Sequence, residues 1–99
     1  SFAQSPIARL EELRLAAVIA RLEAELALGR HVAIVPELQD LGAEHPRRER
    51  IRELLMLALY RSGRQVEALE VYRATSAELM DTFGVEPGLL RRVALRLAG

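Results

Sequence analysis

Residues 54–72 read LLMLALYRSGRQVEALEVY, and this stretch decides the fold. Its first half is rich in Leu and Ala, two residues with high helix propensity. Gly63 then follows, and glycine is the residue that most often ends a helix because it accepts a left-handed backbone conformation. Beyond it, Val66, Leu69 and Tyr72 return at helical spacing. The stretch therefore predicts a helical hairpin that turns at Gly63.

Helical patterns extend from this hairpin in both directions. Ser5 and Pro6 have the residue types of an N-cap and a first helical position. The expected helices cover residues 6–28, 31–44, 47–62 and 65–83, with a short last helix after Gly88. In the first helix, the apolar stripe expected to face the core is Leu10, Leu13, Ala17, Ala20, Ala24 and Leu28. With no strand pattern present, we predict an all-α fold of about five helices in antiparallel hairpins.

An internal repeat is visible in the positions of the glycines that end helices. Gly29 and Gly63 are 34 residues apart, which is the period of a tetratricopeptide repeat. The second copy also has Ala68 and Tyr72, where a small residue permits close helix packing and an aromatic ring fills the adjoining space. We therefore expect Gly29, Gly63, Ala68 and Tyr72 to pack a tetratricopeptide-like stack. A plain helical bundle with a coincidental spacing is the alternative.

Composition limits the classes of function. The chain has 99 residues, the size of a single domain, with 14 basic and 14 acidic residues and no cysteine. Zero net charge and 4% aromatic residues argue against sequence-specific DNA binding by this domain alone. The longest apolar run, residues 54–60, is too short for a membrane span, and no signal-peptide pattern opens the chain. We expect a cytoplasmic protein, and the Ser at position 1 predicts a piece of a longer one.

The zero net charge conceals two halves of opposite sign. Residues 1–46 hold four arginines and seven acidic residues, whereas residues 47–99 hold ten arginines and seven acidic residues. The densest basic stretch comprises Arg47, Arg48, Arg50 and Arg52. Two interpretations remain open. This stretch is either a docking patch for an acidic partner or a solvated cluster paired with Glu49 and Glu53.

The candidate partner-binding surface combines Arg47 and Arg48 of this basic stretch with five residues, from Arg50 to Arg61, that tetratricopeptide geometry would place on the concave face, which the first helix of each pair lines. The residues expected to bind a protein segment are Arg47, Arg48, Arg50, Glu53, Leu57, Tyr60 and Arg61. Leu57 and Tyr60 are also compatible with a plain core role. We predict no enzyme and no cofactor, because no nucleophile, acid–base pair or metal-ligand set is recognisable. His31 and His45 lack the spacing of two metal ligands on one helical face.

Several segments resemble the bacterial transcriptional activator domain. They are residues 10–17, 25–31, 44–46, 48–50, 55–65, 67–69 with Tyr72, and 83–88 with Leu79 before them, and the resemblance runs from about residue 8 to residue 97. The segments LYRSGR and GVEPG are the most specific of them. The resemblance implies an all-helical, tetratricopeptide-like domain of a SARP-type transcription activator from an actinobacterium. It also implies that a DNA-binding winged-helix domain precedes this chain in the parent protein and lies outside it.

The implied role of such a domain is regulation and oligomerisation through protein contacts. The implied partners are its own DNA-binding domain, a second copy in a homodimer, or the transcription machinery, but neither specific DNA nor a membrane. Two departures from the family pattern are Arg47 and the segment 89–92. The alternative function is a generic tetratricopeptide-like scaffold in a larger multidomain signalling protein.

Overall fold

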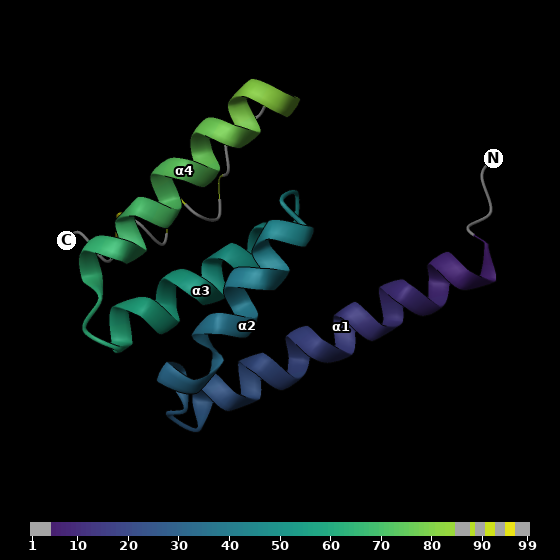
Figure 1. The fold of residues 1–99 in the computed structure, drawn as a ribbon, viewed down its shortest axis with the longest axis horizontal. Helices are drawn as coiled ribbons and strands as arrows, with labels where there is room; N and C mark the ends of the chain where they lie inside the picture. Colours follow the sequence, from purple (N-terminus) through teal and green to yellow (C-terminus); the bar gives the residue numbers. More distant parts are fainter. Residues whose placement is uncertain (1–4, 85–87, 89–90, 93–94, 97–99) are drawn as a thin grey trace.

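The computed structural model describes residues 5–84, 88, 91–92 and 95–96 (Figure 1). It contains α1 (Pro6–Ala27), α2 (His31–Glu44), α3 (Glu49–Arg61) and α4 (Gln65–Phe83). Within these residues there is no strand, so the prediction of an all-helical fold is confirmed. The last helix expected after Gly88 lies largely outside the described residues. None of the described helices is both long and apolar enough to cross a membrane.

The helix starts follow local chemistry. At the start of α1, the Ala8 amide donates to the Ser5 side chain at 3.1 Å and Pro6 is the first helical residue, as the sequence predicts. The expected start of the third helix at Arg47 is wrong, because α3 begins at Glu49. The preceding residues form a turn closed by the Arg48 amide, which donates to the His45 carbonyl at 3.0 Å. An acidic first residue, with Arg47 and Arg48 outside the helix, suits the positive end of the helix dipole.

Two helix ends 34 residues apart have the same backbone geometry. Gly29 and Gly63 have φ angles of 81° and 80°, in the left-handed region that favours glycine. After each glycine, the next amide donates back to the fifth carbonyl before it, Arg30 to Glu25 at 3.0 Å and Arg64 to Leu59 at 2.8 Å. The chain reversals predicted at Gly29 and Gly63 are thus present and have the same backbone geometry, and the tetratricopeptide-like stack stays a prediction.

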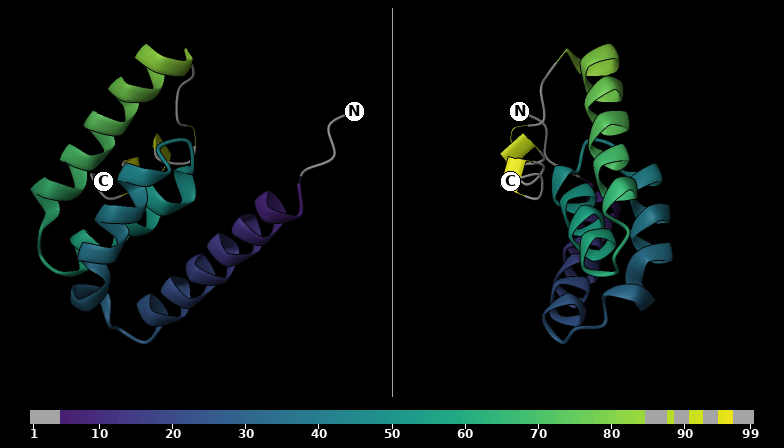
Figure 2. Two further views of the ribbon diagram at one scale, coloured as in Figure 1. Left: turned by 45° about the vertical axis from the view of Figure 1, so that its right-hand side comes forward. Right: turned by 90° about the vertical axis from the view of Figure 1, so that its left-hand side faces the viewer.

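The core surrounds α3, which packs between α2 and α4 (Figures 1 and 2). The helical spacing of α3 predicts that Ile51, Leu54, Leu55, Ala58 and Leu59 face inward; all five are buried, and Met56 joins them. The core comprises Leu15, Leu22, Leu26, Ile34, Val35, Leu38, Ile51, Leu54, Leu55, Met56, Ala58, Leu59 and Ala68. Ala68 is fully buried, and Tyr72 packs against this core while partly exposed. Among the described helices, α1 contacts α2 and α3 only.

The predicted inward face of α1 is wrong. Leu10, Leu13 and Leu28 are 54%, 61% and 66% exposed, and the alanines of the predicted stripe are exposed as well. The helix instead buries Leu15, Leu22 and Leu26, with Val18 and Ile19 partly buried beside them. Residues 15, 18, 19, 22 and 26 also have helical spacing, so α1 carries apolar faces on two opposite sides. Sequence periodicity alone does not show which of two such faces is buried.

Candidate protein-interaction surface

A shallow groove of about 260 Å³ lies between α1 and α3. Its lining combines Glu23, Leu26 and Ala27 of α1 with Arg50, Leu54, Leu57 and Arg61 of α3. The α3 residues stand at intervals of four, three and four, which places them on one face of the helix. Three predicted partner-binding residues, Arg50, Leu57 and Arg61, are therefore brought together. The groove has an apolar floor, with buried Leu26 and Leu54 beside half-buried Leu57.

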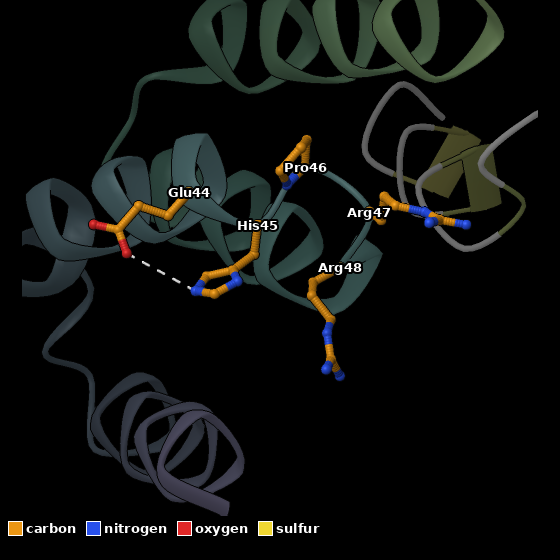
Figure 3. Close-up of a pocket in the computed structure, with 5 residues that line it drawn as sticks. All are labelled: Glu44, His45, Pro46, Arg47 and Arg48. Atoms are coloured by element: carbon orange, nitrogen blue, oxygen red, sulfur yellow. Dashed lines mark ion pairs between the residues drawn. The ribbon is translucent and has the colours of Figure 1, made fainter. Parts of the chain in front are cut away.

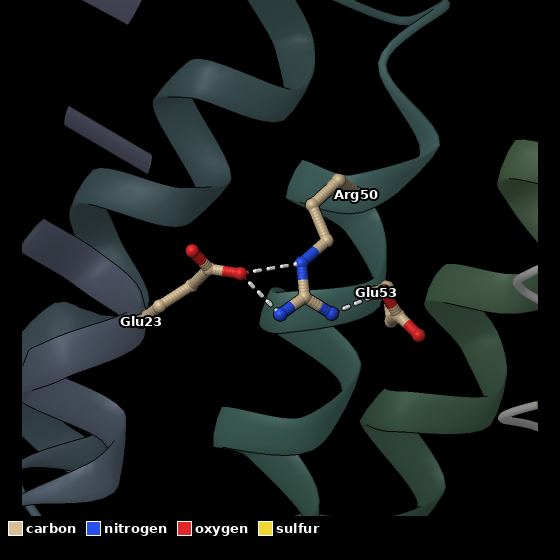
Figure 4. Close-up of polar contacts among 3 residues, drawn as sticks. All are labelled: Glu23, Arg50 and Glu53. Atoms are coloured by element: carbon tan, nitrogen blue, oxygen red, sulfur yellow. Dashed lines mark hydrogen bonds and ion pairs between the residues drawn. The ribbon is translucent and has the colours of Figure 1, made fainter. Parts of the chain in front are cut away.

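At one end of this groove, Arg50 lies between two carboxylates (Figure 4). Its Nε donates to Glu23 Oε2 of α1 at 2.9 Å, and its Nη1 donates to Glu53 Oε1 at 2.5 Å. Partial burial alone lowers the pKa of Arg50, but the hydrogen bonds to Glu53 and Glu23 outweigh it, so the pKa is raised. Arg50 thus links α1 to α3, and its charge is already neutralised within the domain.

At the α3 C-terminal end of the groove, Arg61 is exposed and makes no ion pair with the part of the chain that the structure describes. Arg61 is therefore the cation of this groove that has no carboxylate partner among the described residues. Tyr60, a further predicted partner-binding residue, is 39% exposed but does not line the groove. Glu53 does not line it either, and its carboxylate pairs with Arg50. The groove therefore offers apolar contact and one positive charge.

A second hollow, of about 280 Å³, is formed by the turn before α3, from Glu44 to Arg48 (Figure 3). The side chains of Arg47 and Arg48 diverge from this turn. Arg48 forms an ion pair with Glu12 of α1. The basic stretch of the sequence is consequently divided among the turn, the groove and the interior, and does not form a single patch.

The fourth arginine of that stretch, Arg52, is nearly buried and was not recognised from sequence as a packing residue. Its side chain is 11% exposed. Its guanidinium donates to Thr75 Oγ1 of α4 at 2.5 Å and to the Gly42 carbonyl of α2 at 2.6 Å, and Glu78 lies 3.8 Å away. Two features of the sequence could have pointed to this role. Gly42 lies inside the predicted helix 31–44, and Thr75 lies one turn after Tyr72 in the predicted helix 65–83. Arg52 joins three helices and is not available to a partner.

The predicted spacing of the histidines can be compared with the described geometry. Within residues 5–84 and the short described segments beyond them, no three His, Asp or Glu side chains gather in a way that would hold a metal ion. His31 and His45 lie at opposite ends of α2. The surface is best described as a mixed apolar and charged groove on a helical scaffold.

Comparison with known proteins gives a consistent family. The family model of the bacterial transcriptional activator domain matches residues 1–97. The regulatory protein AfsR of Streptomyces coelicolor is 55% identical over 86 residues, covering 87% of this chain and 9% of AfsR. The regulatory protein DnrI of Streptomyces peucetius is 47% identical over 81 residues, covering 82% of this chain and 30% of DnrI.

A solved structure agrees with these sequence relationships. Mycobacterium tuberculosis EmbR, in complex with a low affinity phosphopeptide, superposes with a TM-score of 0.88 at 40% identity, covering 92% of this chain and 24% of the EmbR chain. This chain thus spans less than a third of each of these relatives. The resemblance seen in the sequence is confirmed: the chain belongs to the bacterial transcriptional activator domain family of SARP-type transcriptional regulators.

Proposed function

We propose that this chain is the regulatory and protein-interaction domain of a cytoplasmic SARP-type transcription activator. In this proposal the helices form a tetratricopeptide-like stack, and DNA is bound by a winged-helix domain outside the chain. The observation that carries the proposal is the family match over residues 1–97, together with relatives that are transcriptional regulators. The domain acts through contacts and not through catalysis.

The groove between α1 and α3 is the proposed docking site for a protein partner. Its apolar floor suits one or two aliphatic or aromatic side chains, and Arg61 suits a carboxylate on the same partner segment. Arg50 is held by Glu23 and Glu53, so it shapes one end of the groove and leaves Arg61 as the charge that selects the partner. The proposed partners are the transcription machinery, the domain's own DNA-binding domain, or a second copy.

The isolated chain is expected to bind DNA weakly and without sequence preference. Its net charge is zero, and Arg21, Arg48, Arg50 and Arg64 already have carboxylate partners. Because its acidic residues are as numerous as its arginines, the domain gains little from releasing counterions from the phosphate backbone, and we expect a Kd no tighter than about 10 μM at physiological salt. A mobility-shift titration with promoter and scrambled duplexes tests this. Tight binding to the promoter duplex alone would contradict the proposed division of labour.

Reversing the charge at Arg61 is expected to weaken partner binding about tenfold or more while leaving the fold intact, because Arg61 is exposed and unpaired among the described residues. The probe is a set of peptides tiled along the subunits of bacterial RNA polymerase, titrated into isotopically labelled chain. Shifts in the amide spectrum should gather at residues lining the groove. Arg61→Glu should abolish these shifts, whereas Arg73→Glu, at an exposed arginine of α4, should not. Peptide shifts that lie away from the groove, or that survive Arg61→Glu, would reject this docking site.

A further inference from the structure

The outward face of α1 has the pattern of a coiled-coil seam. Apolar residues recur at alternating steps of three and four, which is the spacing of the two core positions of a heptad. They are Leu10, Leu13, Ala17, Ala20, Ala24 and Ala27, and every one of them is exposed. Ile7 and Leu28 extend the face at its two ends, 70% and 66% exposed. None of the other described helices lies against this side of α1 (Figures 1 and 2).

We propose that this face pairs with the same face of a second copy of the chain, with the two α1 helices antiparallel. One register sets Leu10 against Ala27 of the second copy and Leu13 against Ala24, while Ala17 meets Ala20 at the two-fold axis. Each outer layer then combines one large and one small side chain, and the two alanines at the centre let the helix axes approach closely. In the same register Ile7 of each copy lies two residues, about 3 Å along the axis, from the level of Leu28 of the other.

The length of α1 sets the size of this interface. At 22 residues, α1 is about 33 Å long, so two such faces bury roughly 700–1,000 Å² in total. Stable dimers generally bury more than about 1,200 Å², so the pairing is reversible and fills at high concentration. On the flank, Arg14 has no ion pair among the described residues and lies midway between the levels of Arg21 and Glu25 of the second copy, and Glu25 already pairs with Arg30 at 3.3 Å within its own chain. Arg21 on the same flank is already neutralised by Glu37.

The pairing of α1 rests on the self-association part of the proposed function and does not involve the groove. The groove lies on the side of α1 that faces α3, and Arg61 belongs to α3. Loss of α1 pairing should therefore leave peptide binding at the groove unchanged. Conversely, Arg61→Glu should leave the oligomeric state unchanged, so that failure of one proposal is distinguishable from failure of the other.

Sedimentation velocity of the 99-residue chain tests the pairing directly. The chain should pass from monomer to dimer with a midpoint on the order of 100 μM. Leu13→Glu should weaken the dimer at least tenfold without changing the helix signal in circular dichroism, because Leu13 is exposed. The matched control is Val66→Glu, at a 69% exposed apolar position on α4, which should dimerise like the parent chain. A chain that stays monomeric at about 0.5 mM, or a dimer that Leu13→Glu leaves intact, would overturn the proposal and assign this face to another occupant.

A side-chain exchange tests the register. Leu13→Ala removes the large residue from two symmetric layers, and Ala24→Leu places two leucines in each of them, so each single variant should weaken the dimer. The double variant Leu13→Ala/Ala24→Leu restores one large and one small residue per layer with the copies exchanged. We expect its dissociation constant to return to within about threefold of the parent chain. A double variant weaker than both single variants would rule out this antiparallel register.

Discussion

Replacing Arg52 with alanine is expected to lower the free energy of unfolding by about 2–4 kcal/mol, because the change leaves buried polar groups without their partner. For a chain of this length the melting temperature should fall by roughly 10–25 °C. Arg52 donates to the Gly42 carbonyl and to Thr75, whose side chain is 1% exposed. Arg52→Lys should recover only part of the loss, since an ammonium group lacks the fork that reaches two acceptors on different helices.

The contact between Arg52 and Gly42 leads to a related prediction for the substitution Gly42→Ala. A Cβ atom at position 42 would lie 2.6 Å from the Nε atom of Arg52, so Gly42→Ala must displace the guanidinium. We expect it to cost about 1–3 kcal/mol, even though alanine favours a helix interior by about 0.5–1 kcal/mol over glycine. In the Arg52→Ala background the clash is absent, and Gly42→Ala should become neutral or stabilising.

Urea denaturation of the parent chain, both single variants and the double variant measures this coupling. Ala43→Gly, at the neighbouring exposed position of α2, reports the helix-propensity part of the change alone. Additive losses in the double variant would mean that Gly42 and Arg52 stabilise the domain independently. The expected change of sign would show that Gly42 is needed to accommodate Arg52.

The division of the basic stretch was predictable in part from helix geometry. Successive residues of a helix are rotated by about 100°, so Arg50 and Arg52 of α3 point to nearly opposite sides. Arg50 turns toward α1 and Arg52 toward α2 and α4. What the sequence did not show was the partner of each arginine, because Gly42 and Thr75 are ten and 23 residues away from Arg52. Contacts between helices are decided by packing, not by local pattern.

Features that depend on local backbone chemistry were predicted correctly. The turns at Gly29 and Gly63 require a left-handed residue, and the cap at Ser5 requires a side-chain acceptor, so residue type is informative at each position. The buried face of α3 was also predictable, because Ile51, Leu54, Leu55, Ala58 and Leu59 recur at helical spacing. The grouping of Leu57 with Arg61 in the groove follows from their helical spacing. The presence of Glu23 in the groove could not be predicted in this way, because it depends on how α1 packs against α3.

Substitutions on the two opposite faces of α1 are expected to differ strongly in their effect on the free energy of unfolding. Leu22 is fully buried on the inward face, whereas Leu13 is 61% exposed on the outward face. Leu22→Ala removes apolar contact and leaves a cavity where α1 meets α2 and α3, and we expect it to cost about 2–5 kcal/mol. Leu13→Ala should change the free energy of unfolding by no more than about 0.5 kcal/mol.

Both variants should be compared by urea denaturation at low micromolar concentration, where pairing with a second copy contributes little stability. The comparison shows which face of α1 packs against the rest of the domain. If the stripe from Leu10 to Leu28 were buried, Leu13→Ala would lower the free energy of unfolding more than Leu22→Ala. A loss for Leu13→Ala as large as that for Leu22→Ala would mean that both faces of α1 are buried within one chain. The expected order instead makes Leu22 an anchor of α1 within the domain and leaves Leu13 available for contact with a second copy.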